Sequence, residues 1–572
     1  MKNWRFYVLV FVLISCFSIV IFRLFSLQVL KYGSYKDQAI DQQQTYQTIY
    51  PKRGEIFMRD RYTSSDSRSL IFPVAISKDF YKVYAIPKDI EEKEETIELL
   101  SPLLEIDKEK LKERIYKEND PYEPLKSKVD EETIKKLNNL NLEGIYSGIE
   151  AWRYFPANEL ACHLLGFVRQ SEGEKSEGQY GVEEFHEKEL AGKTGLAKVG
   201  KDSKGQIISV NQEIIQKSED GADLILTIDP NIQFFVEERL KEAIEQFKST
   251  SGTIIVMEVK TGAIKAITNW PRFNPNNYNQ VEDINIFSNP AIHNLYEPGS
   301  IFKGITMAGA LDRGAVTPQT TYDDKGKVEI SGYVIENALQ RGEGIQTMTQ
   351  VLEKSLNTGA IFAQQKLGKD AFKEYVEKFG FGNKTNIDLK GEASGNISNL
   401  KKKRDLEYAT ASFGQGISVT PIQLVAAFGA IANNGVLLRP YVAEKILYKN
   451  GEEKINKPQE VRKVISSETA SRVTAMMVSA VKNGHTQRAG VEGYSVAAKT
   501  GTAQIPDFEK GGYTEETIHS LIGFFPAFDA RFVMLVKLDK VKGVSFAEGS
   551  AAPVFGEIAK YILNYYEIPP TQ

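Results

Sequence analysis

The sequence predicts a multidomain α+β protein with a single N-terminal transmembrane helix. The chain has 572 residues, which is too many for one ordinary hydrophobic core, so two or three domains are expected. A long apolar segment lies at the N-terminus, and further along, near residue 221, a charged region gives way to apolar strands and helices. Together these observations indicate an anchor followed by at least two folded parts.

The apolar segment follows the basic residue Arg5 and extends over residues 6–30. A helix needs about 17–25 mostly apolar residues to span a bilayer, and the side chain of Arg23 can reach the interface. Signal peptidase requires small residues after the apolar core, and the sequence Phe-Arg-Leu-Phe at 22–25 offers none. We therefore expect an uncleaved signal anchor at 6–30, a cytoplasmic tail at 1–5 and an extracytoplasmic remainder.

Residues 31–220 are rich in lysine and glutamate. Segments such as 90–95 and 108–113 are typical of solvated helices whose Glu and Lys side chains pair one turn apart. The region offers charge but no cluster of catalytic side chains. We expect a non-catalytic domain here that makes contacts with other proteins.

Residues 221–572 have a different character. The segment 224–228 begins a series of apolar strands and helices that ends in a helix at 554–565. This is the part of the chain that can bury a sizeable core, so we expect the catalytic domain here.

Several functions are disfavoured by the composition. The formal net charge of −4 does not indicate a nucleic-acid partner. Cys16 lies in the apolar segment and Cys162 stands alone outside it, so no intramolecular disulfide is expected. The five His residues are scattered, and neither a metal nor another cofactor is expected. Residues 195–201 resemble a phosphate loop, but Asp202 stands where that motif needs Ser or Thr.

Three short motifs occur in order in the C-terminal region: Ser300-Ile301-Phe302-Lys303, Ser355-Leu356-Asn357 and Lys499-Thr500-Gly501. In the first motif, Ser300 and Lys303 are three residues apart and share one face of a helix. A serine hydroxyl is a poor nucleophile unless a base takes its proton. Lys303 can be that base if burial or a neighbouring cation lowers its pKa.

Other copies of the second and third motifs occur, and their context selects between them. Lys-Thr-Gly at 193–195 lies in a polar region, and the copy at 260–262 lies between two strand-like segments and is typical of a hairpin turn. The copy at 499–501 follows small residues that let a ligand approach a strand edge. Ser-x-Asn at 394–396 lies in a Gly-rich loop, whereas 355–357 lies between apolar segments that can direct both side chains into a cleft.

The ordered triple is typical of penicillin-interacting serine enzymes, and the chain resembles the class B penicillin-binding proteins, the monofunctional peptidoglycan D,D-transpeptidases. The resemblance covers nearly the whole chain. It is carried by Arg-Gly-Glu-Ile at 53–56, Arg-Tyr-Phe-Pro at 153–156, Glu-Pro-Gly-Ser at 297–300 and Gly-Gln-Gly at 414–416. It implies an elongated mixed α/β pedestal of the dimerisation type at 31–220. It also implies a penicillin-binding transpeptidase domain at 221–572, built from an antiparallel sheet flanked by helices.

The resemblance implies a role for each residue of the first two motifs. Ser300 would attack the penultimate D-Ala carbonyl of a stem peptide, and Lys303 would accept its proton. Ser355 would relay a proton to the leaving amine. Asn357 would hold Lys303 or the substrate amide.

The third motif would supply positive charge and bind the terminal carboxylate of the substrate. Lys499 would add positive potential beside Ser355. Thr500 and Thr502, flanking Gly501, would hold the terminal carboxylate of the substrate. The backbone N–H groups of Ser300 and Thr502 would form the oxyanion hole.

The resemblance also implies partners and a location. It implies peptidoglycan stem peptides as substrate, β-lactams as covalent inhibitors, and a membrane glycan polymerase with division-complex proteins as partners. Residues 551–555, Ala-Ala-Pro-Val-Phe, look closer to the division, or septal, branch, although Leu356 departs from the Ser more often found in that branch. The protein would sit in the cytoplasmic (inner) membrane as a single-pass protein with its catalytic domain outside.

Two alternatives stay open at this point. One is a membrane-anchored scaffold or sensor that binds penicillin without turnover. The other is a serine β-lactamase or D,D-carboxypeptidase that uses the same triple of motifs.

Overall fold

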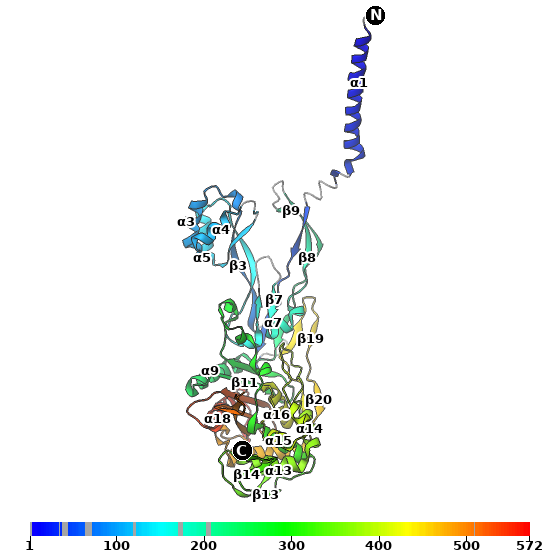
Figure 1. The fold of residues 1–572 in the computed structure, drawn as a ribbon. Coiled ribbons are helices and arrows are strands. Elements are labelled where there is room, and N and C mark those ends of the chain that lie inside the picture. Colours follow the sequence, from blue (N-terminus) through cyan, green and yellow to red (C-terminus); the bar gives the residue numbers. More distant parts are fainter. Residues whose placement is uncertain are drawn as a thin grey trace. The chain divides into compact units, whose positions relative to one another are not determined.

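The computed structural model describes residues 3–33, 35–36, 44–62, 71–117, 120, 122–169, 176–201, 207–507 and 510–571. They form two compact units that alternate along the chain, and Figure 1 labels their elements. Unit 1 contains Met1–Lys52, Asp79–Trp152 and Gly192–Asp220, and unit 2 contains Arg53–Lys78, Arg153–Ala191 and Gly221–Gln572. The expected domain limits at 31–220 and 221–572 stay predictions, because segments of unit 2 lie on both sides of residue 220. Residues 1 and 2 of the expected tail lie outside the described residues.

Unit 1 begins with a long apolar helix. The α-helix α1 (Trp4–Phe25) continues into the π-helical turn η1 (Ser26–Leu30), and together they are long and apolar enough to cross a membrane. No residue of α1 or η1 is buried in the protein. Because apolar side chains cover all its sides, lipid is a better surrounding for this helix than water. The helix is a candidate membrane anchor and matches the expected segment 6–30.

The rest of unit 1 contains two small groups of strands. Strands β1 (Gln44–Ile49), β8 (Gly195–Lys201) and β9 (Ile207–Gln216) form an antiparallel sheet. Helices α3 (Lys93–Leu104), α4 (Lys108–Ile115) and α5 (Glu131–Leu140) share a core with β4 (Glu123–Val129) and the second half of β3 (Ile71–Ala85). β5 (Ile145–Tyr154) also pairs with β3. The helices near 90–95 and 108–113 were expected from the sequence, whereas these strands, whose exposed faces carry many polar residues, were not.

Unit 2 begins with a sheet built from distant parts of the chain. β2 (Ile56–Arg59) lies between the first half of β3 and β10 (Asp223–Leu226), and β18 (Ala443–Leu447) and β19 (Glu453–Ile455) continue the sheet. Five short elements follow β5: α6 (Cys162–Leu165), β6 (Phe167–Arg169), β7 (Glu177–Gln179), α7 (Gly181–Phe185) and α8 (Glu187–Leu190). This part of unit 2 thus combines N-terminal and C-terminal segments.

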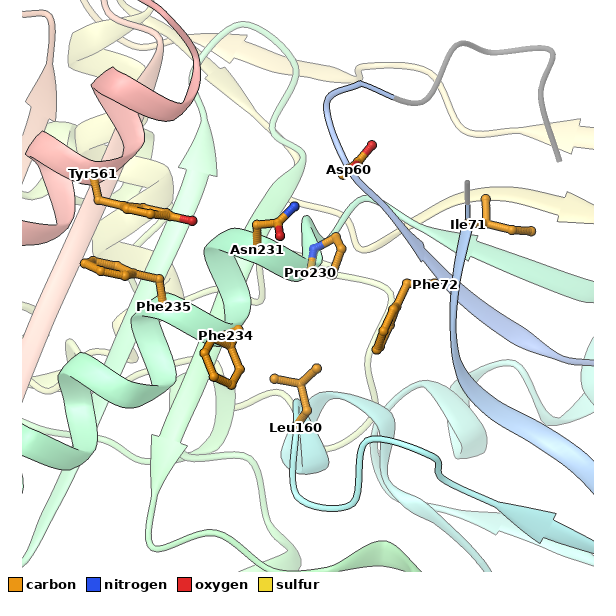
Figure 2. Close-up of a pocket in the computed structure, with 9 residues that line it drawn as sticks. All are labelled: Asp60, Ile71, Phe72, Leu160, Pro230, Asn231, Phe234, Phe235 and Tyr561. Atoms are coloured by element: carbon orange, nitrogen blue, oxygen red, sulfur yellow. The ribbon is translucent and has the colours of Figure 1, made fainter. Parts of the chain in front are cut away.

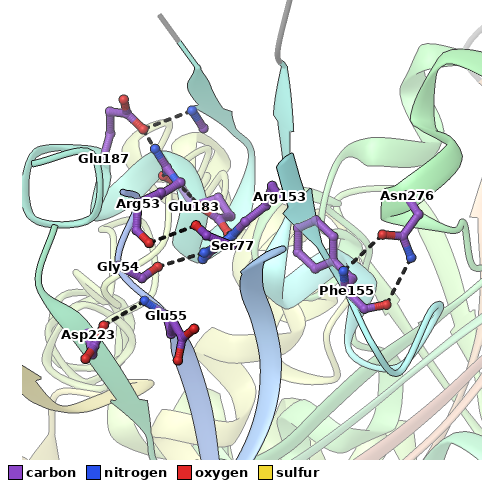
Figure 3. Close-up of polar contacts among 11 residues, drawn as sticks. Arg53, Gly54, Glu55, Ser77, Arg153, Phe155, Glu183, Glu187, Asp223 and Asn276 are labelled. Atoms are coloured by element: carbon purple, nitrogen blue, oxygen red, sulfur yellow. Dashed lines mark hydrogen bonds and ion pairs between the residues drawn. The ribbon is translucent and has the colours of Figure 1, made fainter. Parts of the chain in front are cut away.

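An ion cluster joins these segments of unit 2. The Glu183 carboxylate accepts from Arg53 Nε at 2.7 Å and from Arg153 Nε at 2.6 Å, and Arg153 Nη1 also donates to Gly54 O at 2.7 Å (Figure 3). Glu183 is fully buried. Arg53 and Arg153 are the first residues of two of the motifs that carried the family resemblance. Both motifs therefore supply an arginine to the same buried ion cluster.

The centre of unit 2 is a five-stranded antiparallel sheet in the order β12 (Ile264–Trp270), β11 (Ser251–Glu258), β23 (Phe532–Asp539), β22 (Tyr513–Phe525) and β21 (Ala497–Pro506). Side chains alternate between its faces. On β11, Ile254 and Val256 belong to the core shared with α9 (Pro230–Phe247) and α18 (Ala551–Tyr565). Ile255 and Met257 belong to the other core. The expected α+β class, with helices on an antiparallel sheet, is confirmed.

The second core holds α11 (Lys303–Asp312), α16 (Pro421–Ala432) and α17 (Ser467–Asn483). The remaining helices of unit 2 are α10 (Pro290–His293), α12 (Met348–Glu353), α13 (Asn357–Leu367), α14 (Lys369–Lys378) and α15 (Asp405–Ser412).

The short strands of unit 2 pair antiparallel: β13 (Thr321–Asp324) with β16 (Gly344–Thr347), β14 (Lys327–Ile330) with β15 (Tyr333–Glu336), and β17 (Val436–Leu438) with β20 (Glu460–Lys463). In the part of the chain that the structure describes, the 3-10 turns are η3 (Pro87–Asp89) in unit 1 and η4 (Pro275–Gln280), η5 (Ile284–Phe287), η6 (Gly299–Phe302), η7 (Ser398–Lys401), η8 (Gln487–Ala489) and η9 (Ala547–Gly549) in unit 2.

Candidate active site

Ser300 lies in the 3-10 turn η6, which leads directly into α11 at Lys303. Ser300 and Lys303 were expected on one face of a helix, and Ser300 lies in this tighter winding just before the α-helix. In a 3-10 turn, residues three apart point in the same direction, so the expected common face of the two side chains is kept. Ser300 is half-buried, whereas Lys303 is fully buried. The pair thus combines an accessible hydroxyl with a desolvated amine.

Two glycines let other segments approach this turn closely. A Cβ atom on Gly501 of β21 would lie 2.9 Å from Pro298 O and 3.0 Å from Ile301 Cγ1. A Cβ atom on Gly414 would lie 2.2 Å from Gly299 O, and Gly299 N donates to Gly414 O over 3.1 Å. Side chains at these positions would push the segments apart. The Lys-Thr-Gly strand and the Gly-Gln-Gly loop are therefore in direct contact with the turn that carries Ser300.

The second and third motifs meet Lys303 at one hydroxyl. Lys303 Nζ donates to Ser355 O at 2.5 Å and lies 3.3 Å from Ser355 Oγ. Lys499 Nζ donates to the same Oγ at 3.0 Å and to Thr500 O at 3.1 Å. The structure therefore brings two lysines from separate elements together on Ser355.

Burial changes the protonation of both amines. Desolvation lowers the pKa of Lys303 well below its usual value, and the nearby Lys499 lowers it further. Burial also lowers the pKa of Lys499, to about 7. Two neighbouring ammonium groups repel each other in a buried site, so one of them gives up its proton. This arrangement favours a neutral amine at Lys303, which is what a general base requires.

Ser355 has an unusual backbone conformation. Its φ is +56°, in the left-handed region that residues other than Gly and Asn seldom adopt. Leu356 N donates to Val351 O at 3.0 Å, and α13 begins at the next residue, Asn357. The expected loop between two helices is confirmed, since α12 ends at Glu353. Strain of this kind persists only where the surrounding contacts hold it in place.

Asn357 makes its contact with a neighbouring strand. Its Nδ2 donates to Glu336 O at 2.8 Å, at the end of β15. The expected contact of Asn357 with Lys303 or with a substrate amide stays a prediction.

Thr500, Gly501 and Thr502 follow one another on β21, as expected for residues at a ligand-binding edge. Thr502 Oγ1 accepts from Ala547 N at 3.1 Å and keeps its own proton for donation. On the neighbouring strand, His519 lies opposite Thr502. His519 is fully buried between Ser550 Oγ and Thr517 Oγ1, at 2.8 and 3.0 Å, and its burial lowers its pKa to about 4. It supports the strand as a neutral side chain.

Glu297 and Tyr513 form a contact for which the sequence predicted no role. Glu297 Oε1 accepts from Gly416 N at 2.9 Å, and Glu297 Oε2 accepts from Tyr513 OH at 2.9 Å. Glu297 precedes Ser300 by three residues, but Tyr513 lies 216 residues further along the chain. No local pattern connects such distant positions, so only the folded structure reveals the contact.

A separate hollow of about 720 Å³ lies elsewhere in unit 2 (Figure 2). Its lining consists of Asp60, Ile71, Phe72, Leu160, Pro230, Asn231, Phe234, Phe235 and Tyr561. Four of these nine residues are aromatic, and the described part of the lining includes no serine, cysteine, histidine or lysine. Lys303 and Lys499 meet at Ser355, which is not among these lining residues.

Comparison with known proteins identifies the family. Residues 252–560 match the family model described as "Penicillin binding protein transpeptidase domain", and residues 48–226 match "Penicillin-binding Protein dimerisation domain". The chain belongs to the class B penicillin-binding proteins. In this penicillin-binding protein, all three motifs lie within the matched transpeptidase domain.

Relatives cover nearly the whole penicillin-binding protein. Stage V sporulation protein D of Bacillus subtilis (strain 168) is 33% identical over 527 residues, covering 91% of this chain and 79% of that protein. Peptidoglycan D,D-transpeptidase FtsI of Escherichia coli (strain K12) is 29% identical over 579 residues, covering 99% and 93%. The solved structure of Penicillin Binding Protein 2X from Streptococcus thermophilus has the same fold, with a TM-score of 0.76 at 24% identity over 91% of this chain and 80% of that one.

Proposed function

We propose that this penicillin-binding protein is a peptidoglycan D,D-transpeptidase that cross-links stem peptides through an acyl-enzyme on Ser300. The observation that carries this proposal is the convergence of Lys303 and Lys499 on Ser355, next to the turn that holds Ser300. Two relatives that align with 99% of this chain are named peptidoglycan D,D-transpeptidases. The proposed base and proton relay thus belong to one group of side chains, and the proposed nucleophile lies on the turn that leads into Lys303.

The first half-reaction forms the acyl-enzyme. Ser300 Oγ attacks the carbonyl carbon of the penultimate D-Ala, and the neutral amine of Lys303 takes the hydroxyl proton. The bond to the nitrogen of the terminal D-Ala then breaks, and Ser355 delivers a proton to that nitrogen. Ser355 recovers a proton from the lysines beside it, so the leaving group departs as a neutral amine.

The second half-reaction transfers the acyl group. An amine of a neighbouring strand attacks the acyl carbon and loses a proton through the same relay. The bond to Ser300 Oγ breaks, and the serine regains its proton. The product is a peptide cross-link between two strands.

Charge stabilisation comes from β21. The Lys499 cation, with the hydroxyls of Thr500 and Thr502, supplies donors for the terminal carboxylate of the substrate. The N–H groups of Ser300 and Thr502 serve as the oxyanion hole, where each donor is typically worth about 3–4 kcal/mol in the transition state. Gly501 lets the turn that carries Ser300 pack closely against this strand.

The location and partners form part of the same proposal. The N-terminal helix anchors the protein in the cytoplasmic membrane, with the basic N-terminus inside and the enzyme outside. We also propose a septal role, with a membrane glycan polymerase and division-complex proteins as partners, as the resemblance of residues 551–555 to the division branch implies. We expect residues 79–152 of unit 1 to make protein contacts. Replacing them by a flexible linker, which leaves Arg53 and Arg153 in place, should preserve penicillin labelling and abolish growth complementation.

Covalent labelling with a fluorescent penicillin tests the proposed chemistry. The full chain in detergent and its Ser300→Ala variant are labelled side by side and followed over hours. A stable adduct in the wild type that is absent in the variant supports the transpeptidase. A rapidly hydrolysed adduct would indicate a β-lactamase, and no adduct would indicate a scaffold without acyl transfer.

A further inference from the structure

The helix that carries Asn357 is capped by a residue outside its own sequence. The first backbone N–H groups of an α-helix have no partner within the helix, and a polar side chain at the preceding position usually accepts from them. In α13 that position is Leu356, which has no side-chain oxygen. Asn337 Oδ1 caps the helix instead, because it accepts from Asn357 N at 2.8 Å and from Thr358 N at 3.2 Å.

A buried carboxylate sets the orientation of the Asn337 amide. Asn337 Nδ2 donates to both oxygens of Asp324, each at 3.0 Å. Asp324 Oδ1 also accepts from Thr358 Oγ1 at 2.7 Å. Because only the NH₂ end of the amide can donate to a carboxylate, its oxygen must face the helix. Asp324 is 2% exposed and Asn337 is 4% exposed, so water does not compete for these bonds.

The capped helix end adjoins the strained serine of the second motif. Ser355 has a φ of +56° and lies shortly before Asn357, whose N–H group is the first to be capped. Its carbonyl oxygen and hydroxyl accept from Lys303, and its hydroxyl accepts from Lys499. A shift of the helix end would therefore move Ser355 relative to both lysines.

We propose that Asn337, oriented by Asp324, is a positioning residue for acyl transfer, because it caps α13 from outside and so places Ser355 and Asn357 against the two lysines. Asn337 itself does not touch the reacting atoms. This inference rests on the proposed function. It also gives a reason why Leu356 is compatible with the second motif in this chain: the cap that a polar residue would provide there comes from Asn337.

The test uses a variant that separates positioning from stability. Asn337→Ala removes the outside cap, and adding Leu356→Ser supplies a cap at the usual position, where the backbone is already extended, with φ −75° and ψ 124°. Leu356 is buried in the core, so the serine should lower Tm further while it restores the cap. A purely structural role would make acylation and Tm fall together.

The rate of acylation by fluorescent penicillin is measured on the full chain at a saturating concentration. The fraction of protein labelled at the end point gives the fraction that is folded. We expect Asn337→Ala to slow acylation about tenfold. The double variant should acylate at least about threefold faster than Asn337→Ala in spite of its lower Tm. Asn276→Ala is the matched control, because Asn276 both donates to and accepts from the backbone of Phe155, and its described hydrogen bonds do not involve the three catalytic motifs. It should lower Tm and leave the acylation rate unchanged.

Two results would overturn the inference: a rate in Asn337→Ala within about twofold of the wild type, or a double variant no faster than Asn337→Ala. Either result leaves the proposed function intact if the wild type is acylated at Ser300. A wild type that forms no adduct counts against the proposed function itself.

Discussion

Lys499 donates to Ser355 Oγ over 3.0 Å, although the two residues are 144 positions apart in the chain. Lys303 reaches the same oxygen from a different element, at 3.3 Å. A hydroxyl carries one proton and two lone pairs, so Ser355 Oγ can accept from both amines and keep its own proton for donation. Ser355 can therefore give up that proton and recover one from a lysine beside it.

Replacing Lys303 by Met should remove the base and keep the fold. The rate of acylation by fluorescent penicillin should fall by about 10²- to 10⁴-fold, the usual contribution of a general base. The Tm should stay the same or rise, because a fully buried amine is replaced by an apolar side chain of similar length. Lys366→Met, on the exposed side of α13, is the control and should acylate normally. A Lys303→Met variant that retains more than a tenth of the rate would exclude Lys303 as the base.

The free energy of unfolding should increase as the pH rises from about 7 toward 10. Burial lowers the pKa of Lys499 to about 7 in the folded protein, whereas the usual value is 10.5. Between these values the unfolded chain binds more protons than the folded one, so a higher pH favours folding. Lys303, whose pKa is also lowered, contributes in the same direction. Urea unfolding at pH 7, 8 and 9 should show a flatter dependence for Lys499→Met, and equal slopes in both proteins would contradict this assignment.

Tyr513→Phe should slow acylation without unfolding the protein. The substitution removes the hydroxyl that donates to Glu297, whose other oxygen holds Gly416 N beside the nucleophile turn. A hydrogen bond to a carboxylate contributes about 1 kcal/mol or more, which corresponds to a rate about fivefold lower if the turn loosens. Labelling kinetics with Glu515→Gln, an exposed change on the same strand, provide the comparison. Equal rates for both variants would show that the Tyr513 contact does not reach the reaction.

Glu183→Gln should destabilise unit 2 strongly. The substitution leaves Arg53 and Arg153 as buried guanidinium groups without the carboxylate between them (Figure 3). Breaking a buried ion pair in this way costs about 3–5 kcal/mol. Chemical denaturation monitored by tryptophan fluorescence measures the loss.

The matched control for this change is Glu177→Gln, which breaks the exposed pair of Glu177 with Arg169. An exposed pair contributes less than about 1 kcal/mol. Similar losses of unfolding free energy in both variants would show that the buried Glu183 cluster stabilises the protein no more than an exposed ion pair does.

Features that depend on near neighbours in the chain could be predicted from the sequence alone. The apolar segment near the N-terminus predicted a membrane-length helix, and α1 and η1 form it. Ser300 and Lys303 were expected to share a face, and the turn η6 that carries Ser300 leads directly into α11 at Lys303. The order and context of the three motifs also indicated the family, because each motif occupies one short segment and its surroundings are contiguous with it in the sequence.

How these segments act together depends on the folded chain. The lowered pKa values of Lys303 and Lys499 follow from burial and mutual proximity, which no spacing along the chain specifies. The cap on α13 joins Asn337 to Asn357, and the contact of Glu297 with Tyr513 spans 216 positions. The alternation of the two units along the chain was missed for the same reason. Hydrogen bonds, desolvation and charge repulsion act over a few ångströms in space, so packing of distant segments determines them.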